Sequence, residues 1–301
     1  MSQTQFPRPQ SEILPTMYDL PSEDPGDMGL PDEFHDFQPQ LLRETCKPPT
    51  YSAADFFVGT DLNLYYDGRH PQWYKRPDWF LALGVSIGDQ QQDMRLSYVL
   101  WQEFISPFLV VELLSPGTAD EDLGRNIREI GKPPIKWEVY EKSLRVPFYV
   151  VFDRYENHFR LFSLTDGKYQ ERQLDEHNPR FWFDELELGL GVWSGCYEGF
   201  EGQWLRWYDG QNNWIPTAIE QTELANQQAY LATKQAALER SRRLRAESQL
   251  AEMEMSRRSA IPQLIGLGLT IEQVATSLGL TTPEVQAVVD VERTDEILDR
   301  I

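Results

Sequence analysis

The stretch SPFLVVELLSPGT, residues 106–118, decides how this chain folds. Its seven residues from Phe108 to Leu114 have the length and apolar character of a buried strand, but Glu112 lies among them. A carboxylate inside a buried strand costs free energy unless it is ion-paired, hydrogen-bonded or bound to a metal ion. The stretch therefore predicts both a central strand and a partner for Glu112.

Two other polar residues are candidates for that partnership. Asp78, in KRPDWFLALGV, opens an apolar strand directly after Pro77, and Lys136, in PPIKWEVYEK, lies in the first turn of a helix predicted after the Glu112 strand. If the two strands are neighbours, Asp78 and Glu112 converge at one end of the sheet. The following helix can then deliver Lys136, with Tyr140 four residues later on the same helix face.

These residue types together predict a metal-assisted site. Hard oxygen ligands suit Mg²⁺ or Mn²⁺, so Asp78 and Glu112 are candidate ligands, with the backbone carbonyl of Leu113 as a further one. The lysine ammonium can orient a nucleophile or stabilise charge on a phosphate. Taken singly, Asp78 is explained as a strand-entry residue, Glu112 as a carboxylate satisfied by other donors, and Lys136 as a solvated lysine. The prediction depends on their combination.

The same segments resemble a known family. The order Pro77-Asp78, then VVELLSPGT, then a lysine with a tyrosine four residues later, then VPFYVVFD resembles the Uma-two-type restriction endonucleases of the PD-(D/E)XK nuclease superfamily. The resemblance covers roughly residues 31–190 and is best between 77 and 153. It implies a restriction-endonuclease-like fold and Mg²⁺- or Mn²⁺-dependent hydrolysis of DNA phosphodiester bonds. Asp78 and Glu112 would bind the metal, and Lys136 would be the catalytic lysine.

The position of the lysine departs from the superfamily pattern. The usual lysine follows the acidic residue by two positions, and Leu114 stands there. The family carries its lysine on the next helix, which Lys136 fits. The intervening segment ADEDLGRNIREIGKPPI, residues 119–135, is longer than expected, so Lys132 is an alternative for the catalytic lysine.

The arrangement of apolar runs predicts an α+β (α/β-like) core with a central mixed β-sheet flanked by helices. A helix is expected from PDEFHDFQPQLLRET, which Pro39 could kink or split, and LSYVLWQEF is a further strand candidate. HFRLFSL and YQERQL, joined by the turn TDGK, predict a hairpin. The chain divides into a flexible acidic lead-in at 1–30, a nuclease-like domain at 31–216, a long helix at 217–258 and a small helical tail at 259–301.

The long helix and the tail suggest association rather than chemistry. Leu224, Leu231 and Leu238 recur every seven residues, which indicates a coiled coil and a homodimer, although Gln228 and Gln235 occupy the companion positions. Four arginines on this helix could meet phosphate, but a solvated face with intrahelical ion pairs explains them better: Arg240, Arg242, Arg243 and Arg245. The tail resembles a helix-turn-helix. Its second helix opens with Thr281, Thr282, Pro283 and Glu284, which favours a packing or dimerisation module over a base reader.

Composition limits the choice of partners. The formal net charge is -20 and the sequence pI about 4.6, so a nucleic-acid site must be a local basic or metal-filled cleft. Two distant cysteines, no apolar leader and no 18-residue apolar run predict a cytoplasmic protein without a membrane span. None of the four histidines has metal-ligand spacing with another. His35, on the early helix, could approach the cleft, but we expect a surface role for it. The alternative to a nuclease is a catalytically inactive nuclease fold that acts as an interaction or dimerisation module.

Overall fold

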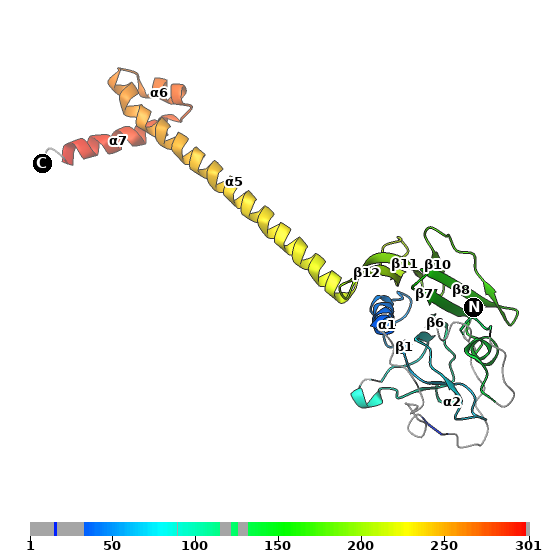
Figure 1. Cartoon of the computed structure of the whole chain (residues 1–301). Coiled ribbons are helices and arrows are strands. Elements are labelled where there is room, and N and C mark those ends of the chain that lie inside the picture. The colour runs from blue at the N-terminus through cyan, green and yellow to red at the C-terminus, as the bar shows by residue number, and fades with distance from the viewer. Residues whose placement is uncertain (1–14, 17–32, 89, 115–121, 126–131, 299–301) are drawn as a thin grey trace. The chain divides into compact units, whose positions relative to one another are not determined.

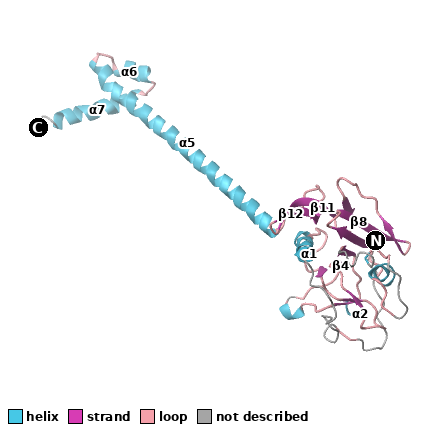
Figure 2. Ribbon diagram, in the orientation of Figure 1, coloured by secondary structure: helices cyan, strands magenta, loops and turns pink. Residues whose placement is uncertain are grey.

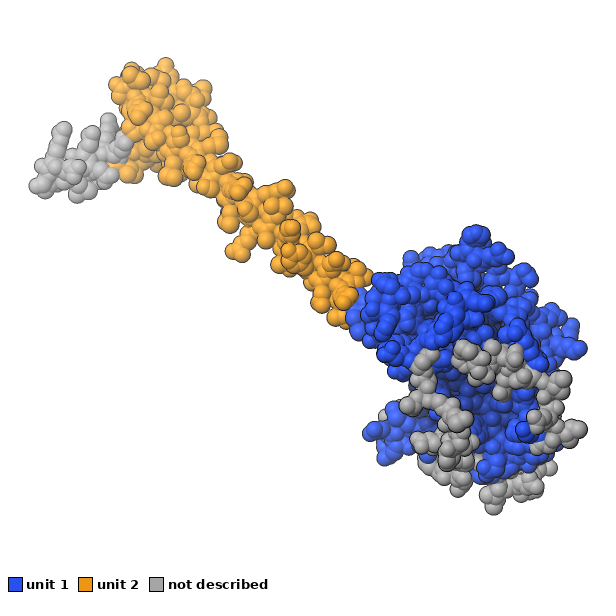
Figure 3. Space-filling model, viewed as in Figure 1, with its two compact units in different colours: residues 1–221 blue, residues 222–301 orange. Residues whose placement is uncertain are grey.

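The computed structural model describes residues 15–16, 33–88, 90–114, 122–125 and 132–298. The predicted lead-in at 1–30 lies outside these residues except for 15 and 16. The chain forms two compact units, residues 1–221 and 222–301, which Figure 3 colours separately. The first unit contains the sheets, and the second is helical.

A six-stranded mixed sheet forms the centre of the first unit (Figures 1 and 2). The strand order is β1-β4-β6-β7-β8-β9, in which β6 and β7 are parallel and every other pair is antiparallel. The expected mixed sheet is therefore confirmed. Its strands are β1 (Phe56–Thr60), β4 (Trp79–Leu83), β6 (Leu109–Leu113), β7 (Phe148–Asp153), β8 (His158–Thr165) and β9 (Lys168–Glu171).

Local sequence explains the hairpin at the edge of this sheet. Strands β8 and β9 pair antiparallel around Asp166 and Gly167, which have φ of 51° and 79°. Two successive positive φ values characterise the type I′ turn, whose twist matches that of the flanking strands. The Asp-Gly pair thus produces the hairpin that the sequence predicts.

Two three-stranded sheets complete the unit. One is formed by β10 (Arg180–Phe183), β11 (Leu188–Tyr197) and β12 (Phe200–Tyr208), and the other by β3 (Tyr74–Lys75), β2 (Leu64–Tyr65) and β5 (Tyr98–Val99). The strand expected over LSYVLWQEF is mostly wrong, because β5 ends at Val99 and a short helix α2 (Leu100–Glu103) follows. Phe104, in the left-handed region at φ 60°, ends that helix.

Helix α1 (Glu33–Thr45) covers the sheet beside β12. Phe34, Leu41 and Leu42 are buried in the same core cluster as strands β4, β6 and β7. Pro39 lies inside the helix and is itself buried, but the helix continues through it. The predicted split at Pro39 therefore does not occur.

The alternation of side chains in β6 divides the core into two layers. Leu109, Val111 and Leu113 belong to the cluster shared with α1 and β10–β12. Val110 and Leu114 belong to the opposite cluster, with Val139 and Tyr140. Glu112 has the parity of this second group, so its carboxylate lies on the face that the helical segment following β6 covers.

That helical segment is shorter and less regular than the sequence predicts. Helix α4 (Lys136–Glu138) passes directly into a π-helix, η2 (Val139–Ser143). Ile135 before it has extended backbone, so Pro134 precedes the helix and is not in its first turn. π-helical turns are rare and are found frequently at functional sites. This one carries Tyr140.

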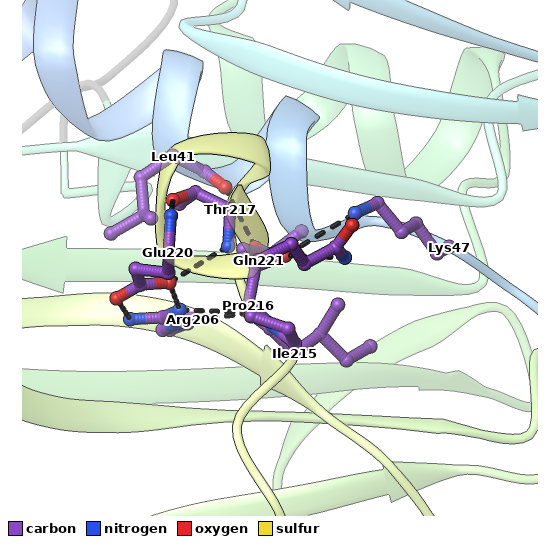
Figure 4. A network of polar contacts seen from close by, with 9 residues as sticks. Leu41, Lys47, Arg206, Ile215, Pro216, Thr217, Glu220 and Gln221 are labelled. Carbon is purple, nitrogen blue, oxygen red and sulfur yellow. Dashed lines mark hydrogen bonds and ion pairs between the residues drawn. The ribbon is translucent and has the colours of Figure 1, made fainter. Parts of the chain in front are cut away.

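The first turn of helix α5 (Ala218–Gly266) belongs to the first unit and is held there by polar contacts (Figure 4). Thr217 and Glu220 form a reciprocal cap, in which each backbone N–H donates to the other's side chain, at 2.7 Å and 3.3 Å. Arg206 on β12, 2% exposed, donates to the Glu220 carboxylate and to the carbonyl of Ile215. Lys47 and Gln221 both donate to the carbonyl of Pro216.

In the second unit, the end of α5 packs with α6 (Ile271–Leu278) and α7 (Thr282–Leu298). The buried residues of this small core are Ile261, Val274, Ala275 and Val285. Gly279, at φ 64°, ends α6, and the Glu284 carboxylate accepts hydrogen bonds from Thr281 at the start of α7. No helix of the described residues is long and apolar enough to span a membrane.

Candidate active site

The two candidate metal ligands lie side by side on neighbouring strands. Strands β4 and β6 pair antiparallel with Trp79 opposite Val111, which sets Asp78 beside Glu112. The backbone N–H of Leu113 donates to Asp78 Oδ2 at 2.6 Å, and the N–H of Asp78 donates to Glu112 Oε2 at 3.4 Å. The predicted convergence at one end of the sheet is therefore observed.

Lys136 and Tyr140 join these acids from the helical segment. Lys136 Nζ lies 2.9 Å from Glu112 Oε2, and the Tyr140 hydroxyl donates to Glu112 Oε1 at 2.7 Å. The Glu112 side chain is fully buried, and that of Lys136 is 17% exposed. Lys132, the alternative lysine, is exposed. The fold thus compensates for Leu114 by bringing a lysine from the next helical segment to the acid.

Burial and like charges perturb the titration of both carboxyl groups. Burial raises the pKa of Glu112 well above its usual range, and the nearby charges of Asp78 and Asp122 raise it further against the opposing effect of Lys136. Burial also raises the pKa of Asp78. Burial alone would lower the pKa of Lys136, but Glu112, Asp122 and Asp78 outweigh it and raise that pKa. The site therefore holds a positively charged lysine among acids that repel one another.

Asp122 also belongs to this cluster, although it was not predicted from the sequence. Its side chain is 1% exposed, and its Oδ1 lies 3.1 Å from Lys136 Nζ. Asp122 stands in an acidic run, ADED, where nothing distinguishes it from its neighbours. The residues around it, 115–121 and 126–131, lie outside the described part of the chain.

His35 lies beside the site and not in the expected surface role. Its Nε2 lies 3.1 Å from the carbonyl oxygen of Leu113, and its charge acts on Asp78. The expected surface role is therefore wrong. The helix periodicity could have indicated this, because His35 stands three and seven residues before the buried Gln38 and Leu42.

The donor chemistry fits a hard divalent cation. Asp78 and Glu112 offer carboxylate oxygens, and the Leu113 carbonyl has a second lone pair beside the one directed at His35. Among the residues that the structure describes, no three His, Cys, Asp or Glu side chains are grouped as a ready-made metal cage. A set of two carboxylates and one carbonyl is consistent with Mg²⁺, which usually retains several waters.

The balance of charges in the site also favours a divalent cation. Three carboxylates, Asp78, Glu112 and Asp122, lie around a single ammonium, that of Lys136. This arrangement carries two negative charges in excess when all four groups are ionised. A divalent cation would neutralise that excess, and the raised pKa values of Asp78 and Glu112 show that negative charge is unfavourable at these two carboxyl groups.

The mixed sheet with its flanking helices is consistent with a restriction-endonuclease-like fold. The family comparison agrees: the model of the Uma2 family, described as "Putative restriction endonuclease", matches residues 29–194, more than half of the chain. The chain belongs to the Uma2 family. No curated protein matches it.

Proposed function

We propose that this protein is a Mg²⁺- or Mn²⁺-dependent endonuclease that hydrolyses phosphodiester bonds in DNA. The observation that carries the proposal is the position of Glu112. It is fully buried, it accepts hydrogen bonds from Lys136 and Tyr140, and it lies beside Asp78. A purely structural carboxylate does not require a second and a third acid around the same ammonium.

Each residue has a distinct role in this proposal. Asp78, Glu112 and the Leu113 carbonyl would hold the cation, and Tyr140 and His35 would fix the orientation of Glu112 and of that carbonyl. When bound, the cation would make a water more acidic and neutralise charge on the phosphate. The Lys136 ammonium would orient the attacking water and stabilise the negative charge that builds on the phosphate oxygens. Breaking the P–O3′ bond would leave a 5′-phosphate and a 3′-hydroxyl.

The strongly acidic composition shapes the proposal. A net charge of -20 repels the DNA backbone, and physiological salt screens this repulsion only beyond a Debye length of about 8 Å. We therefore propose that contact with DNA is weak without a cation in the site. An inactive nuclease fold serving as an interaction module is the competing function, and cleavage decides between them.

The test is nicking of supercoiled plasmid by purified protein in Mg²⁺ or Mn²⁺. We expect Asp78→Asn and Glu112→Gln each to slow nicking by at least about 100-fold, the usual effect of removing a charge-stabilising group. Excess EDTA should abolish nicking. Glu171→Gln is the matched control, because Glu171 is a partly exposed acid paired with Arg160. Equal, slow nicking by the wild type and both site variants would favour the inactive fold.

Helix α5 supports a further proposal, that two copies associate. Leu224, Leu231 and Leu238 are 54%, 59% and 53% exposed, at the seven-residue spacing of a coiled coil. A second copy of the same helix offers the same row of leucines, so a two-fold dimer would cover both rows. Such a dimer would provide two nuclease sites for the two strands of a duplex.

The cytoplasm remains the proposed location. Cys46 and Cys196 are both free, and burial strongly raises the pKa of the Cys46 thiol. A buried and an exposed free thiol are compatible with a reducing compartment. Fractionation of cells that express the protein tests the location.

A further inference from the structure

Asp122 is held in place from several directions. The Tyr149 hydroxyl donates to its backbone carbonyl at 2.9 Å. Leu123 packs against the core cluster that contains Tyr140. Gly124, at φ 68°, lets the chain turn closely over Trp137, since a Cβ atom there would lie 2.8 Å from the indole ring. The backbone thus directs the Asp122 carboxylate toward Lys136.

Within the described part of the chain, the Asp122 carboxylate has few other groups to interact with. Its Oδ1 lies within ion-pair distance of Lys136 Nζ, and among the described residues neither of its oxygens has a partner in hydrogen-bond geometry. A carboxylate that is 1% exposed and lacks such partners is costly to bury. Among the described residues, Lys136 is therefore the group that compensates the buried charge of Asp122.

We propose that Asp122 is a positioning residue that holds Lys136 in its catalytic orientation while the cation is bound. This inference rests on the proposed function. Lys136 contacts Glu112 Oε2 at 2.9 Å and Asp122 Oδ1 at 3.1 Å. A cation held by Glu112 would compete with Lys136 for the Glu112 oxygens and would repel the ammonium. Asp122 is then the acid that still attracts Lys136 and keeps it beside the reacting phosphate.

Two other roles for Asp122 make different predictions. If Asp122 were a metal ligand, its loss would weaken metal binding as much as the loss of Glu112. If it only stabilised the fold, its loss would slow a variant that lacks Lys136 as much as it slows the wild type. A residue that acts through Lys136 has no effect on the rate once Lys136 is absent.

The experiment is a double-mutant cycle in the full chain with Asp122→Asn, Lys136→Met and the double variant. We measure single-turnover plasmid nicking and, separately, Mn²⁺ affinity by electron paramagnetic resonance. Asp122→Asn should slow nicking about 10- to 100-fold, because small misplacements of a catalytic group have effects of this order. In the Lys136→Met background it should change the rate by less than about threefold. The Mn²⁺ affinity of the single variant Asp122→Asn should fall less than about tenfold, whereas that of Glu112→Gln should fall at least about 100-fold.

Glu141→Gln is the matched control. Glu141 is also a buried acid, 9% exposed, and its Oε1 accepts from the backbone N–H of Tyr169 at 2.8 Å. This variant should nick DNA at the wild-type rate, and circular dichroism verifies that every variant is folded.

Three results overturn the inference: equal slowing by Asp122→Asn in both backgrounds, loss of Mn²⁺ affinity as large as in Glu112→Gln, or an unchanged nicking rate. Each leaves the proposed function intact, provided that the wild type still nicks DNA through Lys136. A wild type with no nicking that depends on Lys136 removes the proposed function and this inference together.

Discussion

The two units of the chain depart from ordinary protein chemistry in opposite ways. The first unit buries charge, with Glu112 and Asp122 at 0% and 1% exposure around Lys136. The second unit exposes apolar side chains, with leucines more than half exposed along α5. Buried charge is costly unless a partner compensates it, and a continuous row of exposed apolar side chains typically marks a surface that binds a partner. The buried cluster fits a small cation, and the exposed row fits a second copy of the helix.

Ion pairs show the same difference on a smaller scale. Lys136 and Glu112 are 17% and 0% exposed, whereas Arg243 and Glu247 on α5 are 83% and 60% exposed. Removing one partner of a buried pair leaves an uncompensated charge, while an exposed pair contributes little because water and salt screen it. The same residue types are therefore energetically important in the buried pair of the first unit and serve mainly for solvation on α5.

The largest expected effect concerns the exposed leucines. Replacing Leu224, Leu231 and Leu238 together by Gln should raise the dimer dissociation constant at least about 1,000-fold, since burial of each leucine is worth about 1.5 kcal/mol or more. Sedimentation velocity measures the change. Leu244→Gln is the control, because Leu244 is equally exposed, at 57%, but stands outside the seven-residue register. A wild type that stays monomeric at about 100 µM would contradict the dimer.

Next in size is the loss of the buried ammonium. In EDTA, Lys136→Met should lower the free energy of unfolding by about 3 kcal/mol, because Glu112 and Asp122 lose their cationic partner. Urea unfolding measures it. Lys142→Met is the control, since Lys142 is 62% exposed and pairs with Glu138 on the surface. Equal losses of unfolding free energy in Lys136→Met and Lys142→Met would show that the buried ion pairs stabilise the protein no more than the exposed pair.

A smaller effect is expected where α5 begins. Glu220→Ala removes the helix cap with Thr217 and one partner of the buried Arg206 (Figure 4). The expected loss in free energy of unfolding is about 1–2 kcal/mol. Glu223→Ala, one turn further along the helix at an exposed position, should change nothing measurable. Thermal unfolding compares the two variants. Indistinguishable melting temperatures for Glu220→Ala and Glu223→Ala would show that the cap and the Arg206 contact at the start of α5 do not stabilise the protein.

The smallest effect belongs to the surface of α5. Glu247→Ala breaks the exposed pair with Arg243 and should change the free energy of unfolding by less than about 0.5 kcal/mol. The same urea titration measures it. A loss comparable to that of Lys136→Met would remove the distinction between the two units.

Much of the core could be predicted because its signals are local. The run around Glu112 has strand length, Asp166 and Gly167 define a hairpin turn, and the Pro77-Asp78 pair opens an apolar strand. The three predicted site residues meet because strand pairing and side-chain alternation have few solutions. Their catalytic and metal-binding roles remain predictions.

The parts that could not be predicted depend on contacts between distant segments. Asp122 belongs to the site because it forms an ion pair with Lys136, 14 residues later in the chain. The acidic residues next to Asp122 in the chain give no reason to single it out. His35 reaches Leu113 only because α1 packs over β6, 78 residues away in the chain. The end of β5 at Val99 is also difficult to predict, because the aromatic and apolar residues of LSYVLWQEF favour a strand beyond this point, where the structure has the short helix α2.

The most direct test of the central claim is anomalous diffraction from crystals of the protein grown with Mn²⁺. The account predicts one strong manganese peak in the core, within coordination distance of the Asp78 and Glu112 carboxylates and the Leu113 carbonyl, and its loss in Glu112→Gln. A manganese-free core with Glu112 still bound to Lys136 and Tyr140, or a peak that persists in the variant, would contradict it.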